Sequence, residues 1–212
     1  EEYSQVSASK GRDLAEKIEE EGIVLVKNDG LLPLSTKKHE VVNLFGFGTV
    51  QWIYGGSGSG RVLPQSDNFD DNTDFAFAMD DYGIDINYDL IDYYRDYATV
   101  THDINTLNFN VDESPYSFGL KEPDIHQADY ASLLEDSISF SDTAIVTISR
   151  QGGESEDMPT VQYKSKPIET IDNSRHSLEI STEEEDLLNF AQDHFDNVIV
   201  IINSTNSFQL DF

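Results

Sequence analysis

The chain lacks cysteine altogether, and this absence excludes disulfide bonds and thiolate metal sites. It also lacks an apolar run of about 18 residues, the length that a membrane-spanning helix requires. Basic residues are scarce: 13 Lys and Arg stand against 41 Asp and Glu, which gives a formal net charge of −28. Nucleic acid and anionic membrane surfaces are therefore not expected as partners, because both require clustered positive charge. No secretion signal is recognisable, and a bacterial cytoplasmic and a cell-surface location both stay open.

The apolar content is that of a folded domain. Apolar residues make up 38% of the chain and include 12 Phe and 10 Tyr, which excludes a disordered polymer. A chain of 212 residues can bury a substantial core. Because we find neither an internal repeat nor an inner boundary, we predict one α/β domain over residues 1–212. The acidic residues are expected mainly on a solvated surface that keeps the protein soluble.

Continuously apolar segments alternate with amphipathic ones along the chain. Helices are expected over residues 9–21, 73–82, 88–98, 130–140 and 181–195, and strands over residues 23–28, 41–48, 84–86, 143–149 and 198–202. Ser181 and Glu184 form a capping box at the head of the last helix. Apolar strands separated by such helices predict a three-layer αβα sandwich around a mostly parallel sheet. Residues 99–128 lack clear periodicity, and residues 160–178 are expected to be a polar insertion.

A glycine-rich loop, "WIYGGSGSGR", follows the second predicted strand, at the edge where such sheets bind ligands. A phosphate-binding loop of the Walker A type needs a Lys and a following hydroxyl, and residues 55–62 have Arg61 and Val62 there. A dinucleotide fingerprint starts at Gly46 and Gly48, but Gln51 stands where its third glycine belongs. The glycines therefore either permit a tight, irregular turn or let the backbone approach another ligand closely.

A second loop, "RQGGESEDM", follows the predicted strand over residues 143–149 and carries three carboxylates, Glu154, Glu156 and Asp157. General acid catalysis needs a carboxyl group whose pKa lies near the working pH, which burial or a second carboxylate can supply. The alternative is a solvated loop tip. A metal site is not expected, because the five histidines are scattered and neither H-E-x-x-H nor EF-hand spacing occurs.

Four segments, in order along the whole chain, resemble the α/β-sandwich domain of glycoside hydrolase family 3, the family of β-glucosidases and related exo-acting enzymes. The segments are "EEEGIVLVKNDGLLPL", "VVNLFGFG" with "YGGSGSG", "SDTAIVTISRQGGESED" and "FDNVIVIINSTNSFQLDF". The resemblance is greatest to the branch in which this domain precedes the barrel domain. In the family this domain continues toward a glycine-rich segment, so we expect further strands beyond "QLDF".

The resemblance implies a retaining mechanism. An aspartate on a (β/α)-barrel domain would be the nucleophile, and a glutamate on this domain would be the acid/base. The family pattern G-E-G-x-D-R falls on residues 153–158 and makes Glu154 the acid/base candidate, with Glu156 as backup and Asp157 in a supporting role. Ser155 replaces a common Gly, and Met158 replaces a common Arg that would anchor the loop. No cofactor is implied, since the chemistry needs only two carboxyl groups and water.

The resemblance also places the glycine loop against the sugar. Related enzymes carry an aromatic platform near this loop, and Trp52 and Tyr54 are its candidates, although packing at the seam with the barrel would equally explain them. The other candidate substrate-binding residues are Gly56, Ser57, Gly58 and Arg150.

The function expected from the resemblance is that of a β-glycosidase domain acting with a barrel domain of the same polypeptide on a β-glucoside or related carbohydrate. The sugar stays open between glucose, xylose, N-acetylglucosamine and arabinose. We expect the 212 residues by themselves to be inactive, because they hold far too few βα units for a barrel. The alternatives are a non-catalytic carbohydrate-binding or interaction module and, less favoured, a nucleotide-binding domain.

Overall fold

A computed structural model describes residues 2–34, 40–56, 74–101, 119–120, 122–154, 157–164 and 169–210. The chain forms two compact units, Glu1–Leu34 and Ser35–Phe212, and each is described here by itself. The expectation of one domain over residues 1–212 stays a prediction.

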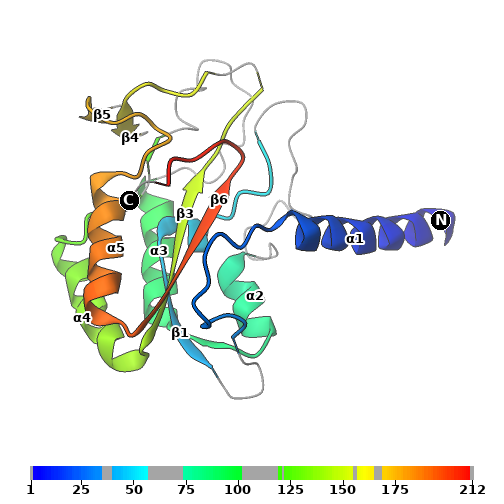
Figure 1. Cartoon of the computed structure of the whole chain (residues 1–212), viewed down its shortest axis with the longest axis horizontal. Coiled ribbons are helices and arrows are strands. Elements are labelled where there is room, and N and C mark those ends of the chain that lie inside the picture. Colours follow the sequence, from blue (N-terminus) through cyan, green and yellow to red (C-terminus); the bar gives the residue numbers. More distant parts are fainter. Residues whose placement is uncertain are drawn as a thin grey trace. The chain divides into compact units, whose positions relative to one another are not determined.

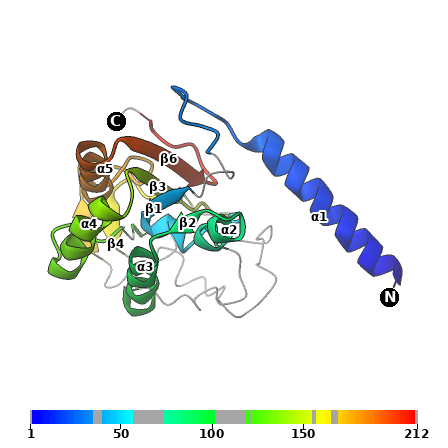
Figure 2. The same cartoon turned by 90° about the horizontal axis from the view of Figure 1, so that it is seen from below.

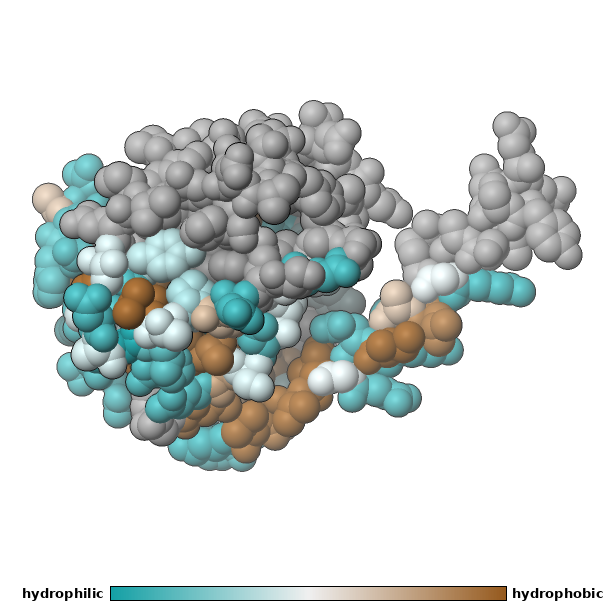
Figure 3. All heavy atoms as spheres, turned by 90° about the horizontal axis from the view of Figure 1, so that it is seen from above, coloured by the Kyte–Doolittle hydropathy of each residue, from teal (hydrophilic) through white to brown (hydrophobic). Residues whose placement is uncertain are grey.

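The first unit consists of helix α1 (Glu2–Gly22) and an extended segment. The helix begins earlier than the predicted residue 9. Leu14 and Ile18 are 58% and 63% exposed, and Figure 3 shows apolar side chains on the surface of this unit. The strand predicted over residues 23–28 is wrong, because these residues form no strand and residues 23–26 are 61–78% exposed. An apolar segment becomes a strand only where a neighbouring strand accepts its backbone hydrogen bonds.

The second unit is built on a parallel sheet (Figure 1). Its strands are β1 (Val41–Phe45), β2 (Asp85–Ile86), β3 (Thr143–Arg150) and β6 (Asn197–Ser204), in the spatial order β2-β1-β3-β6. All three pairings are parallel. β3 is buried along almost its whole length, whereas β6 at the edge is half-buried. The predicted mostly parallel sheet is confirmed, and its carboxyl-end edge carries the described parts of both loops singled out above, residues 52–56 and 151–154.

Helices flank this sheet on both sides (Figure 2). They are α2 (Phe75–Asp81), α3 (Tyr88–Thr101), α4 (Ala128–Phe140) and α5 (Thr182–His194). Figure 2 shows α3, α4 and α5 on one side and α2 on the other, which is the predicted α/β layering. Phe45 of β1 packs against Phe190 and Phe195 at α5, with ring centroids 6.3 and 5.5 Å apart. The core therefore lies between β1, β3 and the three helices on that side.

Local signals set the ends of several elements. At α5 the predicted capping box is present, since Ser181 accepts a hydrogen bond from the Glu184 N–H and the Glu184 carboxylate accepts one from the Ser181 N–H. After β1, Gly46 has φ +90°, and a Cβ atom there would lie 2.2 Å from the Thr147 carbonyl oxygen. Only glycine fits this position. The chain then turns through a short 3₁₀ helix, η1 (Phe47–Thr49).

The predicted polar insertion holds structure that periodicity missed. β4 (Gln162–Lys164) and β5 (Glu169–Asp172) form an antiparallel pair. Strands of three and four residues are too short to show an alternating pattern. Helix α3 also continues to Thr101, into the predicted excursion.

Candidate active site

Three segments meet beyond the carboxyl ends of β1, β3 and β6. We call residues 52–56 the aromatic loop and residues 151–154 with 157–158 the carboxylate loop; the third segment is residues 203–206, which end β6 and follow it. Asn203 holds the aromatic loop by two hydrogen bonds: its Oδ1 accepts from the Ile53 N–H at 2.8 Å, and its Nδ2 donates to the Ile53 carbonyl at 3.1 Å. The aromatic loop is thus fixed to the sheet edge by a residue 150 positions away.

The carboxylate loop is fixed to the same third segment. The Gly152 N–H donates to Thr205 Oγ1 at 2.7 Å, and the Thr205 N–H donates to the Arg150 carbonyl at 3.1 Å. A Cβ atom at Gly152 would lie 2.3 Å from Asn206 Oδ1, so the loop passes close to the Asn206 side chain, which would have to move for any larger residue. A Cβ atom at Gly56 would lie 3.0 Å from the Gly152 carbonyl oxygen. The aromatic and carboxylate loops are therefore in direct contact.

Arg150 anchors the carboxylate loop to the protein interior. Its guanidinium donates to both carboxylate oxygens of Glu184, at 2.6 and 2.5 Å. It also donates to the carbonyls of Ser177 at 2.6 Å and Glu179 at 2.8 Å, and lies 5.1 Å from the centre of the Phe208 ring. Its side chain is 4% exposed. Substrate binding by Arg150 stays a prediction; the contacts in this structure are those of an anchor.

The aromatic loop packs on the start of α2. The Trp52 ring stacks on Phe75, with centroids 5.4 Å apart and planes 20° apart. Tyr54 is 40% exposed, and partial burial together with the nearby Asp74 carboxylate raises the pKa of its hydroxyl. Asp74 caps α2 by accepting from the Phe77 N–H at 2.7 Å, and it pairs with Arg95 of α3 at 3.1 Å. One face of Trp52 is thus occupied by Phe75.

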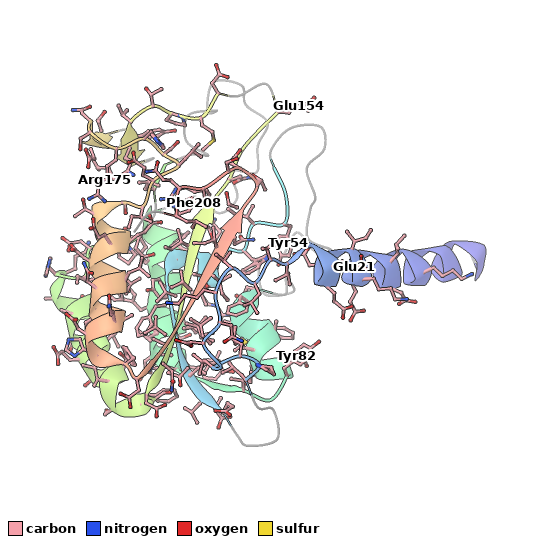
Figure 4. All side chains as sticks on the ribbon, viewed as in Figure 1. Glu21, Tyr54, Tyr82, Glu154, Arg175 and Phe208 are labelled. Atoms are coloured by element: carbon pink, nitrogen blue, oxygen red, sulfur yellow. The ribbon has the colours of Figure 1, made fainter. Side chains whose placement is uncertain are left out.

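The predicted acids lie at the outer end of this site. Glu154 and Asp157 are exposed, and Figure 4 shows Glu154 beyond the carboxyl end of β3. The backup acid Glu156 and the loop residues Ser57 and Gly58 lie outside the described residues. Within the described ranges, no group of three His, Asp or Glu side chains could hold a metal ion. Nor is any helix of the described part both long and apolar enough to cross a membrane.

Sequence reasoning missed three residues that shape this site and a fourth, Glu122, that binds the turn preceding the aromatic loop. Asn203, Thr205 and Asn206 belong to "INSTN", whose signal is a run of small polar residues directly after an apolar strand. Glu122 lies buried behind the end of β1, and burial raises the pKa of its carboxyl to about 8. No local pattern marks it, because its segment has no clear periodicity.

A comparison with known protein families shows which family the chain belongs to. Residues 23–212 match the family model described as "Glycosyl hydrolase family 3 C-terminal domain". The chain belongs to glycosyl hydrolase family 3. The resemblance recognised in the sequence is therefore confirmed for nearly the whole chain, and with it the assignment to a glycoside hydrolase domain.

Curated relatives within family 3 include two bacterial β-glucosidases. The chain is 27% identical over 196 residues to beta-glucosidase A of Butyrivibrio fibrisolvens, an alignment that covers 86% of this chain and 21% of that protein. It is 26% identical over 203 residues to a beta-glucosidase of Ruminococcus albus, covering 93% of this chain and 18% of that protein. The chain thus spans about a fifth of the length of these relatives.

Solved family 3 structures share the fold. Beta-glucosidase 3B of Thermotoga neapolitana, in complex with glucose, superposes with a TM-score of 0.70 at 22% identity, covering 96% of this chain and 25% of that one. A beta-glucosidase of Paenibacillus barengoltzii superposes with a TM-score of 0.65 at 20% identity, covering 89% of this chain and 18% of that one. These likenesses support the α/β fold described above.

Proposed function

We propose that this domain supplies the general acid/base, Glu154, of a retaining β-glycosidase whose nucleophile lies on a barrel domain of the same polypeptide. The observation that carries the proposal is the contact between the aromatic and carboxylate loops, at Gly56 and Gly152. This contact joins the two loops that carry the platform candidates and Glu154, at the edge where α/β sheets bind ligands. The family membership supplies the reaction class.

The chemistry assigns Glu154 two proton transfers. In the first step the barrel carboxylate forms a bond to the anomeric carbon, the glycosidic C–O bond breaks, and Glu154 donates its proton to the departing oxygen. In the second step Glu154 takes a proton from a water molecule, which attacks the anomeric carbon and releases the nucleophile. A retaining enzyme holds the two carboxyl groups about 5–5.5 Å apart, so the exposed Glu154 has to face the second domain.

The remaining residues position the substrate or the acid. Tyr54, and the face of Trp52 turned away from Phe75, are the proposed platform for the leaving-group sugar, since aromatic faces suit the apolar faces of sugar rings. Arg150 is the proposed positioning residue, because its buried ion pair fixes the loop four residues before Glu154. The related proteins named as β-glucosidases support a β-glucoside as substrate.

Replacement of Glu154 tests this proposal in the complete natural polypeptide. Hydrolysis of aryl β-glucosides with good and poor leaving groups is compared between wild type, Glu154→Ala and the control Glu135→Ala, which removes an exposed carboxylate from α4. We expect Glu154→Ala to lower kcat by about 100- to 10,000-fold on poor leaving groups, and azide to restore turnover as a glycosyl azide. The control is expected to behave as wild type.

Other outcomes would contradict the assignment. Unchanged turnover in Glu154→Ala would exclude it as the acid/base, and Glu156→Ala would then be the next variant. If wild type hydrolyses none of a panel of aryl glycosides, a non-catalytic carbohydrate-binding module becomes the better description.

A further inference from the structure

A buried polar cluster lies directly behind the site, where β1 ends. Glu122 accepts a hydrogen bond from the Phe47 N–H through Oε2 at 2.7 Å, and its Oε1 lies 3.4 Å from the Tyr94 hydroxyl. The Gly46 N–H donates to the Tyr94 hydroxyl at 2.7 Å, and the Tyr94 and Tyr130 hydroxyls are hydrogen-bonded to each other. Two consecutive backbone N–H groups are thus held by one carboxyl and one phenol.

These two N–H groups belong to the turn that leads into the aromatic loop. Phe47 begins η1, and all three residues of η1 are buried. The Phe47 carbonyl accepts from the N–H groups of Val50 at 3.3 Å and Gln51 at 3.2 Å, and Trp52 follows. A change in the hydrogen bond between Glu122 and Phe47 therefore acts on the turn immediately before Trp52.

Phenols and carboxylates surround the Glu122 carboxyl. From α3 it faces Tyr94, together with Tyr93 and Tyr97, whose pKa values are raised to about 12 by burial and by Glu122 itself. From α4 it faces Tyr130. The nearby charged groups of α5 are Glu183 and Glu184, of which Glu184 is paired with Arg150.

The charge state of Glu122 follows from these surroundings. Burial, and to a lesser extent Glu184 and Glu183, raise the pKa of its carboxyl to about 8, against the lowering effect of the hydrogen bonds from Phe47 and Tyr94. Near neutral pH the group therefore carries a proton, and the cluster has no net charge. Deprotonation leaves a charge on a buried carboxyl group, which is costly unless the neighbouring groups move.

Ionisation of Glu122 would draw the Tyr94 hydroxyl toward the carboxylate. A carboxylate is a stronger acceptor than a carboxylic acid, so it draws the Tyr94 hydroxyl closer than the present 3.4 Å. That hydroxyl also accepts from Gly46, so its displacement weakens the hold on the first residue of the turn. Phe47 and Gly46 are then held differently in the two charge states.

We propose that Glu122 is a positioning residue for the aromatic loop: in its protonated form it holds the turn at Gly46 and Phe47 so that Trp52 and Tyr54 stay in place, and its ionisation shifts them. The value of this device to catalysis rests on the proposed function above, whereas the coupling between Glu122 and Trp52 does not. A carboxyl kept only for packing would contribute to stability without coupling its charge to Trp52.

Trp52 itself reports the coupling, because it is the one tryptophan of the 212-residue chain. The emission maximum of Trp52 and its quenching by acrylamide are measured between pH 6 and pH 9.5 in wild type, Glu122→Gln and the control Glu135→Gln. We expect a sigmoidal change with a midpoint near pH 8 in wild type and in the control. Glu122→Gln, which mimics the protonated carboxyl, is expected to keep the low-pH signal throughout.

Two results would overturn the proposal: a wild-type signal that stays constant over this range, or a transition that persists unchanged in Glu122→Gln. If Glu122→Gln does not fold, Tyr94→Phe takes its place. It removes a hydrogen bond that favours the carboxylate, so its midpoint should lie above that of wild type. An unmoved midpoint would count against the mechanism.

A kinetic measurement connects the effect of Glu122 ionisation on the aromatic loop to the proposed function. In the complete natural polypeptide, the alkaline limb of the kcat/KM profile on an aryl β-glucoside is expected to shift in Glu122→Gln and to stay in Glu135→Gln. Failure of the proposed function would remove this activity and leave the Trp52 transition intact. If hydrolysis depends on Glu154 but the fluorescence of Trp52 shows no transition with pH, the proposed role of Glu122 is refuted and the proposed function is not.

Discussion

Two neighbouring glutamates at the start of α5 provide a sharp test of how the carboxylate loop is anchored. Glu184 is 9% exposed and binds Arg150, itself 4% exposed, through both carboxylate oxygens. Glu185 is 44% exposed and pairs with Arg175, 29% exposed, at 2.6 Å. Both residues lie in the first turn of the same helix and carry the same charge. Their replacement by glutamine therefore differs mainly in the burial of the ion pair.

The magnitudes follow from that burial. Removing one partner of a buried pair leaves an uncompensated charge and costs about 3–5 kcal/mol, whereas an exposed pair contributes about 0–1 kcal/mol. Glutamine at position 184 can still complete the capping box with Ser181, so loss of the cap adds little. The amide oxygen also keeps one acceptor for Arg150. We therefore expect Glu184→Gln to lower the free energy of unfolding by about 3 kcal/mol, and Glu185→Gln by less than about 1 kcal/mol.

Urea denaturation at pH 7, followed by far-ultraviolet circular dichroism, measures both variants against wild type. In the complete polypeptide, Glu184→Gln should also lower kcat on poor leaving groups at temperatures where the protein stays folded, because the loop that carries Glu154 loses its anchor. Equal destabilisation by the two variants would refute this prediction, since it would mean that the burial of the Arg150 ion pair does not determine how much the pair contributes to the free energy of unfolding. Full activity in folded Glu184→Gln would refute the positioning role of Arg150.

Two further predictions concern the end of β1. Because burial raises the folded-state pKa of Glu122 to about 8 from the ordinary 4.5, the folded protein binds this proton more tightly than the unfolded chain. The stabilisation from this proton is complete below about pH 4.5 and is lost as the pH rises to about 8. Between about pH 5 and pH 7, the free energy of unfolding of wild type should therefore fall by about 2.5 kcal/mol more than that of Glu122→Gln, as measured by urea titration. No such difference would mean that the carboxyl is hydrated. Gly46→Ala should lower the free energy of unfolding by about 2–4 kcal/mol in the same assay, because its φ is +90° and the new Cβ atom would meet the Thr147 backbone. Gly11→Ala in α1 should be neutral or stabilising by up to about 1 kcal/mol, because no atom lies within 4 Å of the new Cβ atom. Similar effects at the two glycines would contradict the close approach of Gly46 to the Thr147 backbone.

The candidate site depends on polar contacts between segments distant in sequence. Asn203 holds the aromatic loop, Thr205 holds Gly152, and Glu184 holds Arg150. Each contact joins the carboxyl end of one strand to a loop or helix start that belongs to another. These contacts fix the aromatic and carboxylate loops to the sheet edge, as the proposed presentation of Glu154 to a second domain requires.

Local patterns in the sequence determined most of the helices and the main strands of the second unit, although they missed β4 and β5. Apolar runs such as residues 143–149 and 198–202 became β3 and β6, and Ser181 with Glu184 began α5 as expected. These features depend on periodicity and on hydrogen bonds within a few residues, so they can be read before any tertiary contact is known. The four quoted segments also identified the family, because they keep their order along nearly the whole chain.

Only the tertiary structure decided which of these residues meet. The segment over residues 23–28 is as apolar as a core strand but forms none, because no described strand pairs with it. Arg150 was expected at the substrate, and the fold brings Glu184 to it from 34 positions away. Glu122 reaches Phe47 across 75 positions. Burial and charge pairing depend on which segments the fold brings together, and a sequence lists side chains without their neighbours.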